Sequence, residues 1–146
     1  MAVIEKLIKL KGSIGEKDIA AIFDSGSTYS CIQPELAKKL ARAEPLPGPK
    51  DFDTVHRMLR TEKKRKVTAK ERVSLDFDLN GYTFSDEFMI IPELSDPVII
   101  GAATLQKWRM KLNFETDEVI IDPRVTKLRL LMLTTRDHWA PGLLIN

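Results

Sequence analysis

An acid placed between an apolar strand and a run of turn-forming residues is the part of this 146-residue sequence best suited to chemistry. The apolar residues 20–23 lead directly into an acid, a glycine and three hydroxyls: Asp24, Ser25, Gly26, Ser27 and Thr28. A strand end holds a carboxylate rigidly, glycine permits a sharp turn, and surrounding donors favour the ionised acid. The same residues also form ordinary turns that satisfy only their own backbone. On this stretch alone, a site and a turn are equally good interpretations.

The elements that must position this acid follow from the pattern of apolar and turn-forming residues. Residues 2–10 and 17–23 are predicted to be two strands joined by a turn, and residues 29–32 a further short strand. A helix is predicted over 34–40, because it starts with a proline, which suits a first turn, and repeats apolar residues on one face. Three prolines and a glycine at 45–49 predict a break after this helix.

The clearest strand pattern begins at residue 73. Apolar and polar residues alternate over 73–79, Asn80 and Gly81 form a strong hairpin turn, and residues 82–84 start the return strand. The remaining predicted elements are strands at 88–91, 97–101, 110–114 and 119–121 and a short helix at 102–108. Many short strands with one or two short helices predict a mostly β fold.

In combination, these elements resemble the retropepsin-like, or retroviral-type, aspartic protease family, in particular its single-domain bacterial and archaeal members. The matching pieces are residues 22–28, the helix at 34–40, residues 98–105 and the closing hairpin at 114–121. The resemblance covers about residues 14–123. It implies an acid-protease half-barrel with a flap hairpin and one or two short helices, forming one domain over residues 1–123. In this family the chain termini build a shared sheet at the dimer interface.

The resemblance implies an aspartic endopeptidase in which two carboxylates share a proton and activate a water. The chain has one Asp-Ser-Gly triplet, so the second carboxylate would be Asp24 of another copy, across a two-fold axis. Ser25 would hydrogen-bond across the homodimer, and the N–H groups at Gly26 would support the carboxylates. Ser27, with Thr28 beside it in the loop, would donate to the ionised acid and move the activity optimum toward acid pH.

A substrate cleft is also implied, covered by a flap at about residues 52–73. The expected cleft and flap residues are His56, Met58, Ile99, Ile100 and Gly101. The substrate would be an extended peptide or protein bound as an added strand, and no cofactor or metal is implied. The flap departs from the family pattern, because residues 49–80 contain no glycine and residues 60–72 carry seven basic residues against two acidic ones.

Composition excludes several other classes of protein. The chain is 43% hydrophobic and 30% charged, with a net charge of +2, which is typical of a globular domain that is not a general polyanion binder. The single Cys31 forms no internal disulfide and indicates a reducing compartment. No apolar run approaches a membrane span, and the charged N-terminal residues lack a signal-peptide core. We expect a cytoplasmic protein.

Two other functions remain open at this point. A catalytically inactive retropepsin-fold module for dimeric interaction would retain the fold, and the missing flap glycine favours it. A nucleic-acid-associated protein could use the basic segment at 60–72, but nucleic acid is an unlikely partner because no aromatic residue lies there to stack on a base. The apolar tail at 124–146 is available as a dimer-interface strand, as a segment packed on its own protomer, or as an inhibitory segment in the cleft.

Overall fold

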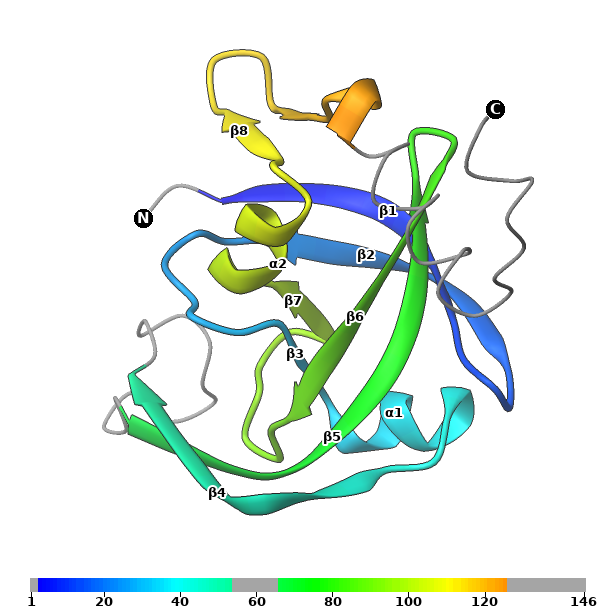
Figure 1. Ribbon diagram of the computed structural model, residues 1–146, viewed down its shortest axis with the longest axis vertical. Coiled ribbons are helices and arrows are strands. Elements are labelled where there is room, and N and C mark those ends of the chain that lie inside the picture. The colour runs from blue at the N-terminus through cyan, green and yellow to red at the C-terminus, as the bar shows by residue number, and fades with distance from the viewer. Residues whose placement is uncertain (1–2, 54–65, 126–146) are drawn as a thin grey trace, which may run out of the picture.

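A barrel of β-strands dominates the chain (Figure 1). The structure is a computed structural model that describes residues 3–53 and 66–125. The strands are β1 (Ile4–Lys11), β2 (Glu16–Phe23), β3 (Cys31–Ile32), β4 (Glu44–Asp53), β5 (Lys66–Leu79), β6 (Tyr82–Ile90), β7 (Val98–Ile100), β8 (Lys111–Asn113) and β9 (Glu118–Ile120). The helices are α1 (Pro34–Leu40) and α2 (Ala102–Lys107).

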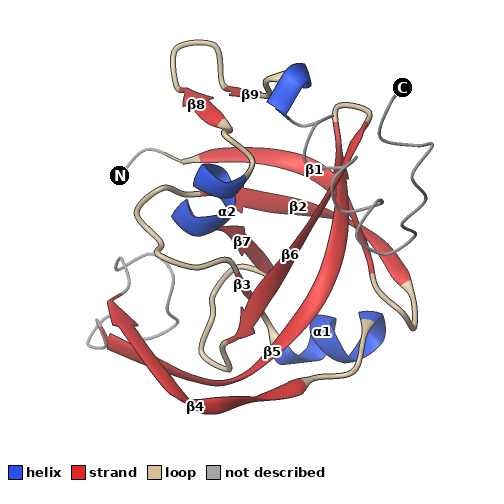
Figure 2. Ribbon diagram, in the orientation of Figure 1, coloured by secondary structure: helices blue, strands red, loops and turns tan. Residues whose placement is uncertain are grey.

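The order of the strands in the large sheet is β1-β2-β7-β3-β6-β5-β4. The 14-residue strand β5 closes the barrel, because the edge of β5 that faces away from β6 has two neighbours. Its first half pairs with β4, and its second half pairs with β1 at Asp76–Asp78. Figure 2 shows β4 and the start of β5 extending away from the barrel as a two-stranded arm. Strands β8 and β9 form a separate two-stranded sheet.

The interior of the barrel is filled by large apolar side chains. The largest fully buried ones include Trp108, Phe23, Phe77, Phe84, Phe88, Ile4, Ile8 and Leu10. Helix α1 closes one end with Leu36, Ala37 and Leu40. Burying a side chain of this size stabilises the fold by about 1.5–3 kcal/mol relative to leaving it exposed.

The predicted fold class is confirmed, and so are several of its elements. The structure is mostly β and its strands form a barrel, with helix α1 at the predicted Pro34–Leu40. The hairpin turn between β5 and β6 is also confirmed. Asn80 and Gly81 have φ angles of 53° and 81°, the left-handed conformation that a two-residue hairpin turn requires.

Two predictions about strands were incomplete. Helix α1 ends before the prolines at 45–49, as predicted, but strand β4, which the sequence did not predict, runs through them. Proline lacks an N–H and is tolerated at a sheet edge and at bulges. Both conditions hold here, because β4 pairs only with β5 among the described strands and its register shifts between Pro45 and Lys50. Residues 66–72 belong to the basic segment of the expected flap, and they form the first half of β5, with Val67 and Ala69 buried.

Candidate active site

Asp24 lies directly after β2, at the point where that strand leaves the sheet. Its backbone N–H donates to the carbonyl oxygen of Ile100 over 2.9 Å. One carboxylate oxygen, Oδ1, accepts the N–H of Gly26 over 2.8 Å. The residue is only 1% exposed, although its neighbours Ser25 and Gly26 are exposed. The acid is therefore fixed by its backbone and by a donor to its carboxylate.

Strand β7 carries the Ile-Ile-Gly segment and lies between the two strands that flank the Asp24 loop. Ile22 of β2 pairs with Ile99 in a parallel register. On the other edge of β7, Cys31 and Ile32 of β3 pair with it in an antiparallel register. The loop at 24–30 therefore leaves the sheet on one side of β7 and returns on the other, which brings it against the start of α2.

The start of α2 holds the loop by its free backbone donors. The first N–H groups of a helix have no partner within the helix. Here Ala102 donates to the carbonyl oxygen of Ser27 over 2.7 Å, and Ala103 donates to that of Thr28 over 3.0 Å. Gly101 permits this close approach, since a Cβ there would lie 2.4 Å from the carbonyl oxygen of Tyr29. The glycine of the Ile-Ile-Gly segment is thus required by packing against the loop.

Two buried hydroxyls add a side-chain link between loop and helix. The Oγ of Ser30 lies 2.5 Å from the Oγ1 of Thr104, and it accepts the N–H of Gly101 over 3.0 Å. Both hydroxyl residues are 1% exposed. This pair could not be predicted from the sequence, because 74 positions separate the two residues and neither stands out in its own segment.

The hydroxyl of Ser27 does not have the role expected for it. Ser27 is buried, but its Oγ donates to the carbonyl oxygen of Tyr29 over 2.7 Å. A hydroxyl has one proton to donate, so this bond replaces the expected donation to Asp24. The predicted acid-shifted optimum loses its basis. Ser25 and Thr28 are exposed on the loop surface.

The residues expected in the cleft separate into three groups. Ile99 belongs to a second apolar cluster, with Ile22, Cys31, Val67, Ala69, Met89, Ile91 and Leu94. The side chain of Ile100 lies instead in the main core, because successive side chains of a strand point to opposite faces. Gly101 packs under the loop, while His56 and Met58 lie outside the described residues.

The second apolar cluster connects the arm formed by β4 and β5 to the floor beside the loop. Val67 and Ala69 come from β5, and Leu46 of β4 packs against the same cluster. Lys50 of β4 places its ammonium group 4.7 Å from the ring centroid of Tyr29, which directly follows Thr28. In this arrangement the arm packs on the strands that carry the Asp24 loop.

Cys31 is the titratable group of this cluster. Its side chain is fully buried, and burial raises the pKa of the thiol to about 12. A hydrogen bond with the Ser27 side chain lowers this pKa, but its effect is smaller than that of burial. A thiol in this state is a poor nucleophile, because the thiolate is the reactive form. Cys31 is therefore an apolar packing residue of the cluster.

Two open hollows of about 680 Å³ lie on the surface, of which one adjoins the loop. Ser25 lines that hollow together with apolar residues from α2, from β8 and from the segment between them, namely Leu105, Leu112 and Met110. Phe114, 49% exposed, stands at it as well.

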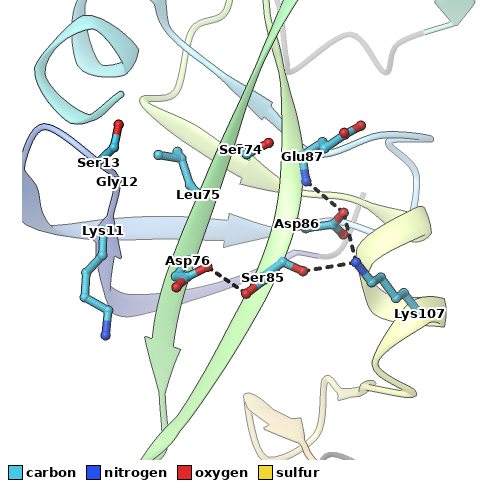
Figure 3. Close-up of a pocket in the computed structure, with 10 residues that line it drawn as sticks. All are labelled: Lys11, Gly12, Ser13, Ser74, Leu75, Asp76, Ser85, Asp86, Glu87 and Lys107. Carbon is cyan, nitrogen blue, oxygen red and sulfur yellow. Dashed lines mark hydrogen bonds and ion pairs between the residues drawn. The ribbon is translucent and has the colours of Figure 1, made fainter. Parts of the chain in front are cut away.

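The other hollow lies across β5, β6 and α2 and is lined by charged groups that pair with one another (Figure 3). Asp76 accepts the hydroxyl of Ser85 over 2.6 Å, and Lys107 lies 3.7 Å from Asp86. Within residues 3–53 and 66–125, no cluster of three or more His, Cys, Asp or Glu side chains could hold a metal ion. The described helices include none with the length and apolar character of a membrane span.

Comparisons with known proteins agree with this geometry. The model of the aspartyl protease family matches residues 10–104, which is 95 of the 146 residues and includes the Asp24 loop and the Ile-Ile-Gly segment. The retroviral protease-like domain of Ddi1 from Leishmania major superposes with a TM-score of 0.52 at 16% identity, over 84% of this chain and 86% of that one. The Simian Foamy Virus (mac) protease gives a TM-score of 0.43 at 17% identity, over 75% and 98% of the two chains. No curated protein matches. On the extent of the family match, the chain belongs to the aspartyl protease family.

Proposed function

We propose that the protein is an aspartic endopeptidase that works as a homodimer, with Asp24 of each protomer facing the other across the two-fold axis. The observation that carries the proposal is the loop itself. Asp24 ends a core strand, its N–H is bound to Ile100, and its Oδ1 accepts the N–H of Gly26. The sequence holds one Asp-Ser-Gly triplet, so a pair of such carboxylates requires a second copy.

Two carboxylates held close share one proton, because like charges at short distance do not both ionise. The ionised Asp24 takes a proton from a water, whose oxygen forms a bond to the carbonyl carbon of the peptide. The protonated Asp24 of the other protomer gives its proton to the carbonyl oxygen. The carbon–nitrogen bond then breaks as one carboxyl gives its proton to the leaving nitrogen. A hydroxyl of the tetrahedral carbon returns its proton to the other carboxylate as the new carbonyl forms, so the pair again holds one shared proton.

The hollow beside Ser25 supports a location for the dimer interface. Ser25 directly follows Asp24, so the face that Ser25 shares must approach the two-fold axis if two Asp24 carboxylates meet. That face carries the apolar hollow at α2 and β8, with Phe114 and Ile120 exposed by 49% and 43%. Exposed apolar groups of this kind mark protein–protein contact sites. We infer that the second copy covers them.

The arm formed by β4 and β5 is our candidate for the flap over a bound peptide. Its inner side contributes Val67 and Ala69 to the cluster that contains Ile99. A peptide bound as an added strand would lie between this arm and the loop. The reducing compartment indicated by Cys31 supports the expected cytoplasmic location.

The proposed activity is tested with Asp24→Asn. This variant removes the ionisable group and keeps its size, so cleavage of an unfolded protein such as casein should fall to background between acid and neutral pH. Asp18→Asn is the control and should retain wild-type activity, because Asp18 is an exposed acid on β2, the strand that ends just before Asp24. The solution mass of both variants should match that of the wild type.

Two results would count against the proposal. Cleavage by purified Asp24→Asn at the wild-type rate contradicts it directly. A wild-type dimer that cleaves nothing at any pH supports the second candidate, an inactive interaction module, which the glycine-free segment at 49–80 favours.

A further inference from the structure

Ser30 and Thr104 form a polar pair inside an otherwise apolar part of the protein. Their hydroxyl oxygens lie 2.5 Å apart, and each residue is 1% exposed. Ser30 ends the Asp24 loop just before β3, and Thr104 lies in the first turn of α2. Neither residue belongs to the expected site, and neither would touch a peptide lying on the exposed side of the loop.

The hydrogen bonds around this pair depend on one another. Ser30 Oγ accepts the N–H of Gly101 over 3.0 Å, and the proton between the two hydroxyls belongs to either Ser30 or Thr104. Without the hydroxyl of Thr104, Ser30 loses its side-chain partner in a buried place. The Ser30 oxygen would still accept the N–H of Gly101, but its hydroxyl proton would have no acceptor. A buried donor left unpaired is costly, so the loop would shift to pair it.

The position of the pair explains why such a shift matters for Asp24. The loop is bound at its beginning through the N–H of Asp24 to Ile100, and at its end through Ser30 to Thr104 and Gly101. Between these points, Ala102 and Ala103 donate to the carbonyl oxygens of Ser27 and Thr28. The carbonyl oxygen of Ser30 also accepts the N–H of Met89 over 2.9 Å, which ties the end of the loop to β6. Movement of the Ser30 side chain therefore acts on the part of the loop that lies against α2.

We propose that Ser30 and Thr104 are positioning residues for the catalytic loop. Their hydrogen bond sets the loop against α2 and so fixes where each Asp24 carboxylate meets its counterpart. This inference rests on the proposed aspartic protease function. The hydrogen bond between Ser30 and Thr104 affects the geometry of the reacting groups and not the peptide-binding surface. Its loss should therefore lower kcat more than it changes KM.

The test compares variants of Thr104 at a temperature where each is fully folded by circular dichroism. Thr104→Val keeps the shape of the side chain and removes its hydroxyl. The kcat for a peptide substrate should then fall by about tenfold to a hundredfold, because the reacting groups are slightly misplaced. KM should stay within about twofold of the wild-type value. Thr104→Ser keeps the hydroxyl and should retain a kcat near that of the wild type. If Thr104→Val does not fold, Thr104→Ala takes its place, since alanine suits a helix.

The matched control is Thr83→Val, which removes a hydroxyl bound to Asp78 over 2.6 Å on the β5–β6 hairpin. This variant should lose stability without losing kcat. The inference is overturned if Thr104→Val and Thr104→Ala, when folded, keep wild-type kcat. A loss of kcat in Thr83→Val or Thr104→Ser equal to that in Thr104→Val overturns it as well, since the pair would then have only a structural role.

A second readout separates this inference from the proposed function. If the wild type cleaves nothing, the proposed function fails, and the hold on the loop is measured by amide hydrogen exchange of Ala102 and Ala103. If these amides exchange faster in Thr104→Val than in the wild type, and at the wild-type rate in Thr83→Val, the result supports the positioning of the loop by Ser30 and Thr104. Unchanged exchange in both variants overturns it.

Discussion

At the scale of single residues, the Asp24 loop divides into side chains that hold the loop and side chains that face outward. Ser27 and Ser30 are buried, and they bind a carbonyl oxygen of the loop and a hydroxyl of α2. Ser25 and Thr28 are exposed. Residue type alone does not separate these groups, because all four are small hydroxyl residues. What separates them is the return of the loop against α2, which depends on contacts distant in sequence.

The buried thiol of Cys31 predicts a specific pH dependence of stability. Its pKa is raised to about 12 by burial, whereas an unfolded chain loses the thiol proton near pH 8.5. Between these values the unfolded state binds fewer protons, so the free energy of unfolding should fall as pH rises, by up to about 1.4 kcal/mol per pH unit.

Thermal unfolding of the wild type and Cys31→Ala between pH 8 and pH 11 measures this effect. The difference between the two unfolding midpoints should change steadily with pH, because only the wild type carries the buried thiol. Parallel curves would show that the thiol ionises equally in both states and would contradict the prediction.

At the scale of elements, the sequence predicted what local patterns determine and missed what the sheet edges determine. Helix α1 and the turn at Asn80 and Gly81 follow from local rules and were found at the predicted places. Strand β4 was missed, because whether prolines are tolerated depends on having only one neighbour. The face on which the side chain of Ile100 lies could not be predicted for a similar reason. In a buried strand both faces are apolar, and the pattern does not say which one faces the cleft.

The packing of the arm on the floor beside the loop is the element-scale prediction. Val67 of β5 is 6% exposed and packs in the same cluster as Cys31. Val67→Ala removes two methylene-sized groups of packing, about 1.5 kcal/mol, which should favour opening of the arm. The rate at which a thiol reagent modifies Cys31 should then rise by about tenfold, since 1.4 kcal/mol is a factor of ten.

Leu7→Ala is the control for this measurement, because Leu7 is 70% exposed on β1. It should leave the rate of modification unchanged. Equal rates for Val67→Ala and the wild type, at equal overall stability, would mean that Cys31 is reached only by global unfolding and that the arm does not open separately.

At the scale of the whole molecule, the proposed active site requires a second copy of the chain. The chain offers one Asp-Ser-Gly loop, and the apolar hollow next to Ser25 continues onto the exposed Phe114. Strands β8 and β9 form a two-stranded sheet on this side (Figure 1), and such a sheet is marginally stable in water by itself. A second copy would cover these features and bring the second carboxylate.

Phe114→Glu tests the location of this interface. A charge placed at an apolar contact should raise the dimer dissociation constant by about tenfold or more, and cleavage should fall with it at low protein concentration. Ile14→Glu is the control, because Ile14 is 64% exposed in the turn bound to the end of α1. Sedimentation equilibrium measures the dimer dissociation constant of each variant. Unchanged dimerisation in Phe114→Glu would place the interface elsewhere.

The central claim is that each active site takes one Asp24 from each of two chains. Its most direct test is to refold wild type and Asp24→Asn together at a fixed total concentration and to measure the rate of peptide cleavage as a function of the wild-type fraction. If the site is shared, mixed dimers are inactive and activity follows the square of that fraction, so that an equal mixture keeps about one quarter of the wild-type rate. Activity that falls in direct proportion to the wild-type fraction would contradict the account, because each chain would then be working alone.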